Sequence, residues 1–170
     1  SRLFEQFVAK ELSWISPAAG LVSKAQDRGT FTCSRGDGKG VFELIPDVRL
    51  IDDRGKTALI VDTKWKSLDM RKRHLGISRE DIYQVLTYGS RFNCADVVLL
   101  YPDVTNETGK TGYYQKFESI LGGRKYLVHV LKIPLLAPTL MVARDLLRKL
   151  ITEKGLPVTN SVAQASALIT

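Results

Sequence analysis

The amino-acid sequence predicts an α/β sandwich, in which helices cover both faces of a mixed central β-sheet. Three observations lead to this prediction. Segments of helical and of β period alternate in the order helix, strand hairpin, helix, two strands and helix. The 170 residues suit one domain, which we expect over residues 1–154, with a tail or short extra helix over residues 155–170. The composition, 44% hydrophobic and 25% charged, is typical of globular proteins and excludes a disordered chain.

The first predicted element is a helix from Leu3 to Trp14, in which apolar side chains recur at the helical period. At about 100° per residue, Glu5 falls at the edge of the apolar face of this helix. Its carboxylate is therefore expected at the border between the core and a cleft. Residues 20–40 are rich in turn formers, with one short β-like stretch at Thr30–Cys33.

A β-hairpin is predicted next, because Val41–Ile51 and Thr57–Trp65 are both rich in β-branched and aliphatic residues. If Arg54-Gly55 forms a two-residue turn, Asp47 stands directly opposite Asp62 on the neighbouring strand. Both side chains then lie on one face of the sheet. A turn longer by one residue would break this register.

Lys64 follows Asp62 by two residues and shares its face of the strand. Two facing carboxylates repel each other, and a bound divalent cation removes that conflict. Mg²⁺ prefers oxygen ligands and takes one or two carboxylates together with water and substrate phosphate. Alternatively, Asp47 and Asp62 are ordinary strand-end acids that pair with Lys64 or Arg49. The spacing leaves both interpretations open.

The second half of the chain predicts four further elements. Ser78 is a suitable N-cap for a helix that ends near Gly89, and Asp81, three residues after Ser78, forms a variant capping box with it. The continuous apolar run Ala95–Tyr101 predicts a strand buried on both faces, and Tyr126–Ile133 predicts another strand. An amphipathic helix is expected over Thr139–Lys154.

The net charge of +7 predicts a polyanionic partner such as nucleic acid. The basic residues are concentrated after the second hairpin strand, where Lys66, Arg71, Lys72 and Arg73 follow Lys64. Contacts of such residues with phosphates would position a duplex without reading its sequence. The alternative for this segment is a solvated basic loop.

Several other classes of protein are not expected. The sequence has no apolar run long enough for a membrane span and no secretory signal, and Cys33 and Cys94 lie far apart, which predicts a cytoplasmic protein without disulfides. His74 and His129 have no second His or Cys at ligand spacing, so zinc is not expected. The stretch Gly109-Lys110-Thr111 lacks the first glycine of a P-loop, so a nucleotide-hydrolysing engine would have to be another chain.

These residues carry a resemblance to a known class of nucleases. Pro46-Asp47 and, after fourteen intervening residues, Asp62-Thr63-Lys64 resemble the PD-(D/E)xK nuclease signature. The pattern follows a helix with Glu5 and precedes a helix in which Gln84 through Tyr88 resemble the Q-x-x-x-Y element of several nucleases of this class. The spacing of four residues puts the Gln84 and Tyr88 side chains on one helix face.

More closely, the chain resembles the McrC family, the nuclease subunits of methylcytosine-dependent restriction systems. The resemblance spans about residues 3–135. It is carried by Leu3-Phe4-Glu5, Ile45-Pro46-Asp47-Val48, Val61-Asp62-Thr63-Lys64-Trp65-Lys66, Asp81-Ile82-Tyr83-Gln84 and Leu99-Leu100-Tyr101-Pro102.

The resemblance implies a restriction-endonuclease-like fold and a Mg²⁺-dependent DNA endonuclease domain of a modified-cytosine-dependent restriction complex, in which Mn²⁺ can replace Mg²⁺. Metal-activated water would hydrolyse phosphodiester bonds of double-stranded DNA. A GTP-hydrolysing AAA+ subunit, McrB-like, would activate the nuclease. Family members usually contact that partner through an additional N-terminal region, which we expect to be missing from this chain.

The resemblance also implies roles for individual residues. Asp47, Asp62 and the Thr63 carbonyl would bind the metal, and Glu5 would reach a metal-bound water. Lys64 would orient or help to deprotonate the attacking water. Gln84 would hold the lysine or the scissile phosphate. DNA contacts are implied for Tyr88, beside Gln84, and for Lys66, Arg71, Lys72 and Arg73, along the DNA backbone.

Two alternatives remain at this stage. The first is a catalytically silent DNA-binding subunit of the same fold, in which the acids are remnants. The second is a repair-type exonuclease of the same superfamily, which Gln84 and Tyr88 suggest.

Overall fold

The computed structural model describes residues 2–69, 71–104, 113–135 and 140–153. In the N-terminal half the elements are α1 (Arg2–Ile15), η1 (Ser16–Ala19), β1 (Val22–Ala25), β2 (Thr30–Ser34), β3 (Gly40–Leu44), β4 (Val48–Ile51) and β5 (Thr57–Thr63). They are followed by η2 (Arg73–Gly76), α2 (Arg79–Arg91), β6 (Asp96–Asp103), β7 (Tyr113–Leu121), β8 (Arg124–Pro134) and α3 (Leu140–Glu153).

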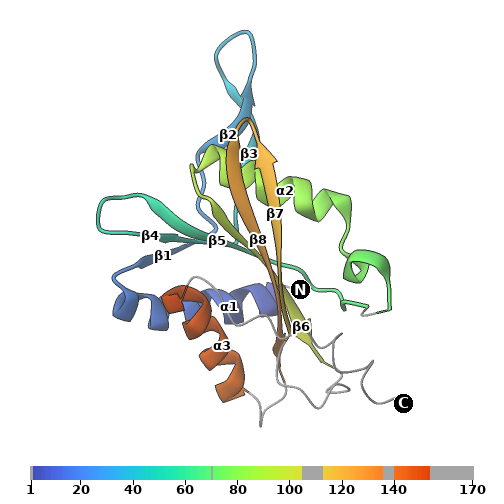
Figure 1. Ribbon diagram of the computed structural model, residues 1–170. Coiled ribbons are helices and arrows are strands. Elements are labelled where there is room, and N and C mark those ends of the chain that lie inside the picture. Colours follow the sequence, from blue (N-terminus) through green and yellow to red (C-terminus); the bar gives the residue numbers. More distant parts are fainter. Residues whose placement is uncertain (1, 70, 105–112, 136–139, 154–170) are drawn as a thin grey trace.

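Six strands form the central sheet, in the order β1-β4-β5-β6-β8-β7. Strands β5, β6 and β8 run parallel to one another, whereas β1, β4 and β7 pair with their neighbours in the antiparallel sense. Helices α1 and α3 lie together on one side of the sheet and α2 lies on the other (Figure 1). The predicted class, a mixed sheet flanked by helices, is confirmed and is consistent with a restriction-endonuclease-like fold.

Two hydrophobic cores lie on opposite faces of this sheet, and β6 contributes to both. Val98 and Leu100 pack in the core that contains α1 and α3, while Val97, Leu99 and Tyr101 pack in the core beneath α2. All five side chains are fully buried. The prediction that this segment is a strand buried on both faces is therefore confirmed. No helix in the described ranges combines the length and the apolar character needed to cross a membrane.

The β4–β5 hairpin has the predicted register but not the predicted turn. Val48 faces Val61 across the two strands. The same register, extended by one residue, puts Asp47 opposite Asp62. The Asp52 amide donates to the Lys56 carbonyl at 2.9 Å, so the loop holds three residues rather than two. A β-bulge at the end of β4 adds one residue on the β5 side and restores the register.

The predicted strand Val41–Ile51 is two strands. Pro46 has no amide hydrogen and cannot donate to a ladder, and the chain changes sheets at Ile45–Asp47. Upstream of this point, β3 pairs with β2 in a separate two-stranded sheet. Strands β1 and β7 were not predicted. Residues 109–111 and 155–170, about which the sequence made predictions, lie outside the described residues.

Helix α2 begins as predicted and ends two residues later than predicted. The Ser78 hydroxyl accepts a hydrogen bond from the Asp81 amide at 3.2 Å, which confirms the N-cap. Gly89 lies inside the helix, where a Cβ would be only 2.9 Å from the Cys94 carbonyl oxygen. This glycine allows α2 to pack closely on its neighbours, and that packing fixes the helix face that carries Gln84.

Candidate active site

The two hairpin aspartates are brought together by the β4–β5 register. Asp47 precedes β4 directly, and its Oδ2 accepts hydrogen bonds from the Thr63 amide at 2.7 Å and the Thr63 hydroxyl at 2.6 Å. Asp62 lies on β5, next to Thr63, and the charge of Asp47 contributes to the raised pKa of Asp62. Thr63 therefore orients Asp47 with two donors from the neighbouring strand.

Asp62 is an acid in a nearly dry environment, with only 3% of its surface exposed. Its Oδ2 lies 2.5 Å from Lys64 Nζ and has no further hydrogen-bond donor within the described residues. Burial raises the pKa of Asp62 to about 6, although Lys64 opposes the shift, and the charges of Asp47 and Asp81 add to it. The carboxylate thus lacks the solvation that its charge requires.

Lys64 is held by a chain of hydrogen bonds from α2. Its ammonium donates to Gln84 Oε1 at 2.7 Å, and Gln84 Nε2 donates to the Tyr88 hydroxyl oxygen at 2.8 Å. The Tyr88 hydroxyl in turn donates to the Ile45 carbonyl at 3.4 Å. The spacing of four residues brings Gln84 and Tyr88 together as predicted, and their bonds fix the position of the lysine.

Tyr88 is 4% exposed, which differs from the surface position that a DNA contact requires. Burial, followed by the charge of Asp62, raises the pKa of Tyr88 to about 12, so the phenol keeps its proton and remains a donor. A direct DNA contact by Tyr88 does not fit this burial. Its hydroxyl instead accepts the hydrogen bond that holds the Gln84 side chain in place.

Glu5 joins the same site through Gln26, which the sequence analysis missed. Gln26 Nε2 donates to Glu5 Oε1 at 2.8 Å and to Asp47 Oδ1 at 3.1 Å. The Gln26 amide also donates to the Asp47 carbonyl at 3.0 Å. The backbone of Gln26 has a φ of 49°, which is uncommon for residues other than glycine. No sequence pattern marks this residue, because it lies in a turn-rich stretch and acts through a left-handed backbone.

Replacing Gln26 by Asn should raise the pKa of Glu5. Burial, and then the charge of Asp47, already raise the pKa of Glu5, and the hydrogen bond from Gln26 opposes that rise. Asn tolerates the left-handed backbone, but its side chain is one methylene shorter and loses the bond. Carboxyl NMR titration of Glu5 measures the shift. An unchanged Glu5 pKa would show that Gln26 does not act on this carboxylate.

Asp81 is a second acid beside the lysines and was predicted only as part of a capping box and of the family pattern. It lies 3.8 Å from Lys64 Nζ and forms an ion pair with Lys66. Burial opposes its ionisation, but the hydrogen bonds from Lys66 and Ser78 and the lysine charges lower its pKa overall. Lys66 is therefore engaged with α2 as well as being predicted to contact DNA.

The predicted alternative for the hairpin acids is realised only in part. Asp62 pairs with Lys64. Arg49, in contrast, forms an ion pair with Asp27 and donates to the Thr57 hydroxyl at 2.8 Å. Asp47 is held by neutral donors, and neither hairpin acid pairs with Arg49.

Asp47 and Asp62 are the residues best placed to hold a divalent cation. In the described part of the chain, no group of three or more His, Cys, Asp or Glu side chains is arranged for a metal. A cation that needs one or two carboxylates and completes its shell with water, as Mg²⁺ does, fits this donor set. The buried Asp62 Oδ2, short of donors, is the atom that such a cation would stabilise. Glu5 is linked to Asp47 through the Gln26 side chain, which donates a hydrogen bond to each carboxylate.

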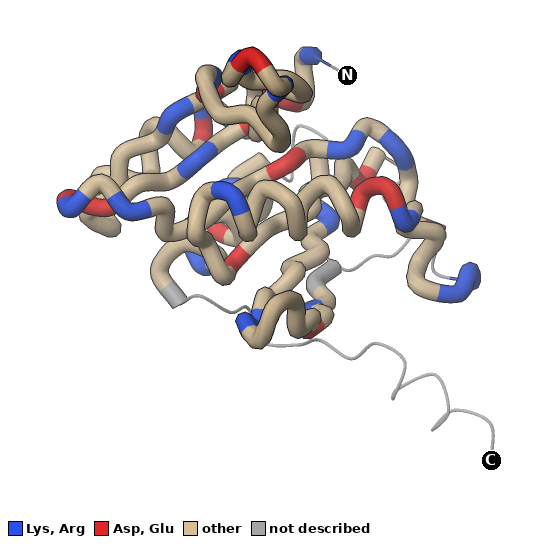
Figure 2. Tube along the Cα trace, turned by 90° about the horizontal axis from the view of Figure 1, so that it is seen from above, with Lys and Arg blue, Asp and Glu red and all other residues tan. Residues whose placement is uncertain are grey.

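The predicted DNA-binding segment forms a loop between β5 and α2. Arg71, Lys72 and Arg73 are exposed, and Asp69 closes the turn by accepting from the Arg71 amide at 3.0 Å. The buried side chain of Leu75 anchors the loop on the core beneath α2. Lys and Arg positions are distributed over several elements, and this loop lies at the edge of the molecule (Figure 2). Arg71 forms an ion pair with Asp69 at 3.3 Å, and the exposed side chains of Lys72 and Arg73 are accessible to a ligand outside the body of the protein.

Comparisons with known proteins match the chain to a protein family and to solved structures. The family model described as McrBC 5-methylcytosine restriction system component matches residues 1–102. A chain from the refined half-complex of the tetradecameric assembly of Thermococcus gammatolerans McrB AAA+ hexamers with bound McrC is similar in structure, with a TM-score of 0.60 and 16% sequence identity. The alignment covers 88% of this chain and 33% of that chain. No curated protein matches the sequence.

Proposed function

Because the chain belongs to the family of McrBC 5-methylcytosine restriction system components, we propose that it is the DNA-cleaving domain of such a system, a Mg²⁺-dependent endonuclease. One observation carries the proposal. Asp47, Asp62 and Lys64 converge on one patch, where the buried Asp62 has a pKa raised to about 6. Perturbed acids of this kind cluster at functional sites.

We propose further that an AAA+ subunit that hydrolyses GTP activates the nuclease. The similar solved chain comes from an assembly of McrB AAA+ hexamers with bound McrC, and this chain spans about a third of its length. The isolated domain is accordingly expected to cleave DNA weakly.

The proposed reaction is attack of water on a phosphodiester phosphorus, with departure of the opposite oxygen. Asp47 and Asp62 would hold the cation, which supplies polarisation of the water and of the phosphate when bound. Lys64, whose Nζ lies 2.5 Å from Asp62 Oδ2, would orient the water and offset charge on the phosphate. Gln84 and Tyr88 keep the ammonium in position, and Thr63 keeps Asp47 in position.

A catalytically silent DNA-binding subunit is the second candidate. One observation favours it: the Asp62 carboxylate already has a cationic partner in Lys64, and the described residues contain no cluster of three acidic, His or Cys ligands. Such an ion pair gives the carboxylate a partner without any metal.

Calorimetric titration with Mg²⁺ separates the two candidates. The nuclease should bind Mg²⁺, and Asp47→Asn or Asp62→Asn should each weaken binding at least about tenfold, because each removes one of the carboxylates on which Mg²⁺ depends. Asp145→Asn, on the exposed surface of α3, is the control and should leave binding unchanged. Binding that is absent, or independent of both hairpin acids, would support the silent subunit. Cleavage of closed circular DNA would exclude the exonuclease.

A further inference from the structure

The β2–β3 hairpin begins and ends beside the candidate active site. Its strands lie between Gln26 and Asp47 in the sequence, and these two residues hydrogen-bond to each other through the Gln26 amide and side chain. The base of the hairpin is therefore fixed beside the acids. In Figure 1 the hairpin projects from the body of the molecule at the end of α2 that lies away from η2.

The hairpin is well ordered internally although it is exposed on both faces. Each strand has five residues, a length of roughly 17 Å, and most of its side chains are exposed. A lone two-stranded hairpin is marginally stable in water, so it needs internal support. The Phe31 ring supplies part of it by packing over Gly40, where a Cβ would be 2.5 Å from the ring. The Asp37 carboxylate closes the tip by accepting from the Lys39 amide at 3.0 Å.

The acidic side chains of the hairpin form ion pairs and hydrogen bonds with residues of the hairpin and the segment just before it. Glu43 accepts from the Gly29 amide and forms an ion pair with Arg28, and Asp37 forms one with Arg35. Lys39, at the tip, has no ion-pair partner among the residues that the structure describes. The charge left for an external partner is positive.

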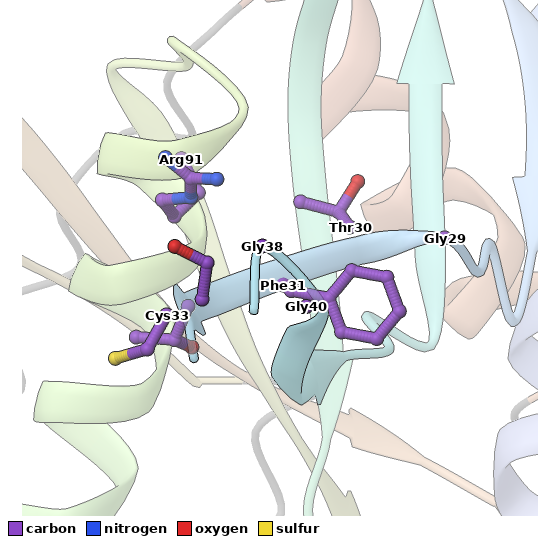
Figure 3. Close-up of a pocket in the computed structure, with 9 residues that line it drawn as sticks. Gly29, Thr30, Phe31, Cys33, Gly38, Gly40 and Arg91 are labelled. Carbon is purple, nitrogen blue, oxygen red and sulfur yellow. The ribbon is translucent and has the colours of Figure 1, made fainter. Parts of the chain in front are cut away.

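A surface pocket of about 520 Å³ lies between the hairpin and the C-terminal end of α2. Hydroxyl groups of β2, including that of Thr30, line it together with the guanidinium of Arg91. Arg91 lies on α2 across from Cys33 and the glycines of the hairpin (Figure 3). Like Lys39, Arg91 has no ion-pair partner in the described ranges of the chain. An arginine beside hydroxyl donors is a suitable site for a phosphate group.

Phe42 is the second unusual feature of the hairpin. Its side chain is 76% exposed, and its backbone φ of 59° is strained for a bulky residue. The packing of the described residues gives no reason for this conformation, which holds an aromatic ring on the outer surface of a projecting hairpin. Such a ring can make apolar contact with a base or sugar.

We propose that the β2–β3 hairpin is a DNA-groove contact: the ribbon lies in the major groove beside the cleavage site, and Lys39 and Arg91 each contact a backbone phosphate. A two-stranded β-ribbon fits the major groove of B-DNA. Arg91 is seven residues from Gln84 along α2, about 10 Å, which corresponds to about three base-pair steps. The hairpin thereby sets the position of the duplex over the acids. This assignment rests on the proposed DNA-cleaving function.

Fluorescence anisotropy with a duplex of about 20 base pairs, in EDTA, tests the contact without cleavage. The double variant Lys39→Ala, Arg91→Ala should bind about tenfold more weakly and lower the salt slope by about 2, because two phosphate contacts are lost. Phe42→Ala should weaken binding severalfold and leave the salt slope unchanged. The control Arg54→Ala, Lys56→Ala removes two charges from the other hairpin loop, at the far end of β4 and β5, and should bind like wild type.

Equal duplex affinity of wild type and both hairpin variants would overturn the assignment. So would an equal loss in the control, since that would indicate net charge rather than a specific surface. Hairpin variants that bind DNA normally but lose activation by an AAA+ subunit would instead make the hairpin a protein contact. Because the anisotropy experiment contains no metal, its result is independent of the Mg²⁺ titration. The groove contact can be disproved while the proposed nuclease function is supported, and the nuclease function can be disproved while the groove contact is supported.

Discussion

Asp62→Asn should reduce Mg²⁺-dependent DNA cleavage by about a thousandfold or more, while leaving duplex affinity unchanged or slightly improved. The substitution keeps the shape of the side chain but removes the negative charge that would hold the cation. Removing the negative charge of Asp62 would also reduce its repulsion of the phosphates of a bound duplex. A plasmid nicking assay with the activating AAA+ subunit and GTP measures the cleavage rate, and anisotropy in EDTA measures duplex affinity.

The matched control for this experiment is Asp103→Asn. Asp103 lies on β6, is as buried as Asp62, and also forms an ion pair with a lysine, Lys132, at 3.3 Å. Its loss therefore tests whether disruption of any buried aspartate–lysine pair reduces activity. If Asp103→Asn lowers the cleavage rate as much as Asp62→Asn, or if Asp62→Asn retains cleavage, the catalytic role of Asp62 is wrong.

The same Asp62→Asn substitution should stabilise the fold at neutral pH, by up to about 3 kcal/mol. Burial raises the pKa of Asp62 to about 6 from an ordinary value of 3.8. An acid whose pKa is raised on folding binds its proton more tightly in the native state. Its contribution to the free energy of unfolding is fully favourable below about pH 4, declines as the pH rises to about 6, and stays low above that value.

The stability difference between variant and wild type should follow that pH dependence. Asn is neutral at every pH, so the advantage of Asp62→Asn should be greatest at pH 7–8, shrink between about pH 6 and 4, and be smallest below pH 4. Urea unfolding at several pH values measures it. A variant that is less stable than wild type at pH 8 would show that the Lys64 ion pair outweighs the cost of burying the charge.

Added Mg²⁺ should reverse the order of stability. A ligand that binds only the native state raises the free energy of unfolding, so wild type should gain stability with Mg²⁺ and Asp62→Asn should gain little. The two unfolding series, with and without Mg²⁺, thus test whether the carboxylate that lowers the free energy of unfolding is also the one that binds the cation. Functional sites commonly carry such a cost in stability.

The sequence predicted the centre of the fold well because that centre depends on local patterns. The two hairpin strands follow from their β-branched and aliphatic residues, and the Ser78 cap follows from one residue and its spacing to Asp81. Ala95–Tyr101 was recognisable because a strand buried on both faces is apolar throughout. The convergence of Asp47, Asp62 and Lys64 was predicted from a two-residue turn that the structure does not have, and it is found only because the β-bulge at the end of β4 compensates for the longer loop.

What the sequence did not predict depends on contacts between distant segments or on backbone conformation. Gln26 acts on Glu5 and Asp47, each 21 residues away, through a left-handed backbone that no composition rule requires. Strand β1 has only four residues and little burial, so it shows no clear alternation. The change of sheets at Pro46 looked like a continuous strand, because both flanking segments have β-forming side chains.

The bulge at the end of β4 makes the spacing of the two acids independent of the loop that joins their strands. The ladder between Val48 and Leu59 fixes which residues face each other, and the irregularity beyond it absorbs the extra loop residue. Insertions and deletions at the exposed tip between Asp52 and Lys56 can therefore accumulate in homologues without moving Asp47 or Asp62. The same tip is a suitable point for grafting an affinity tag or a fluorophore into the protein without disturbing the proposed site.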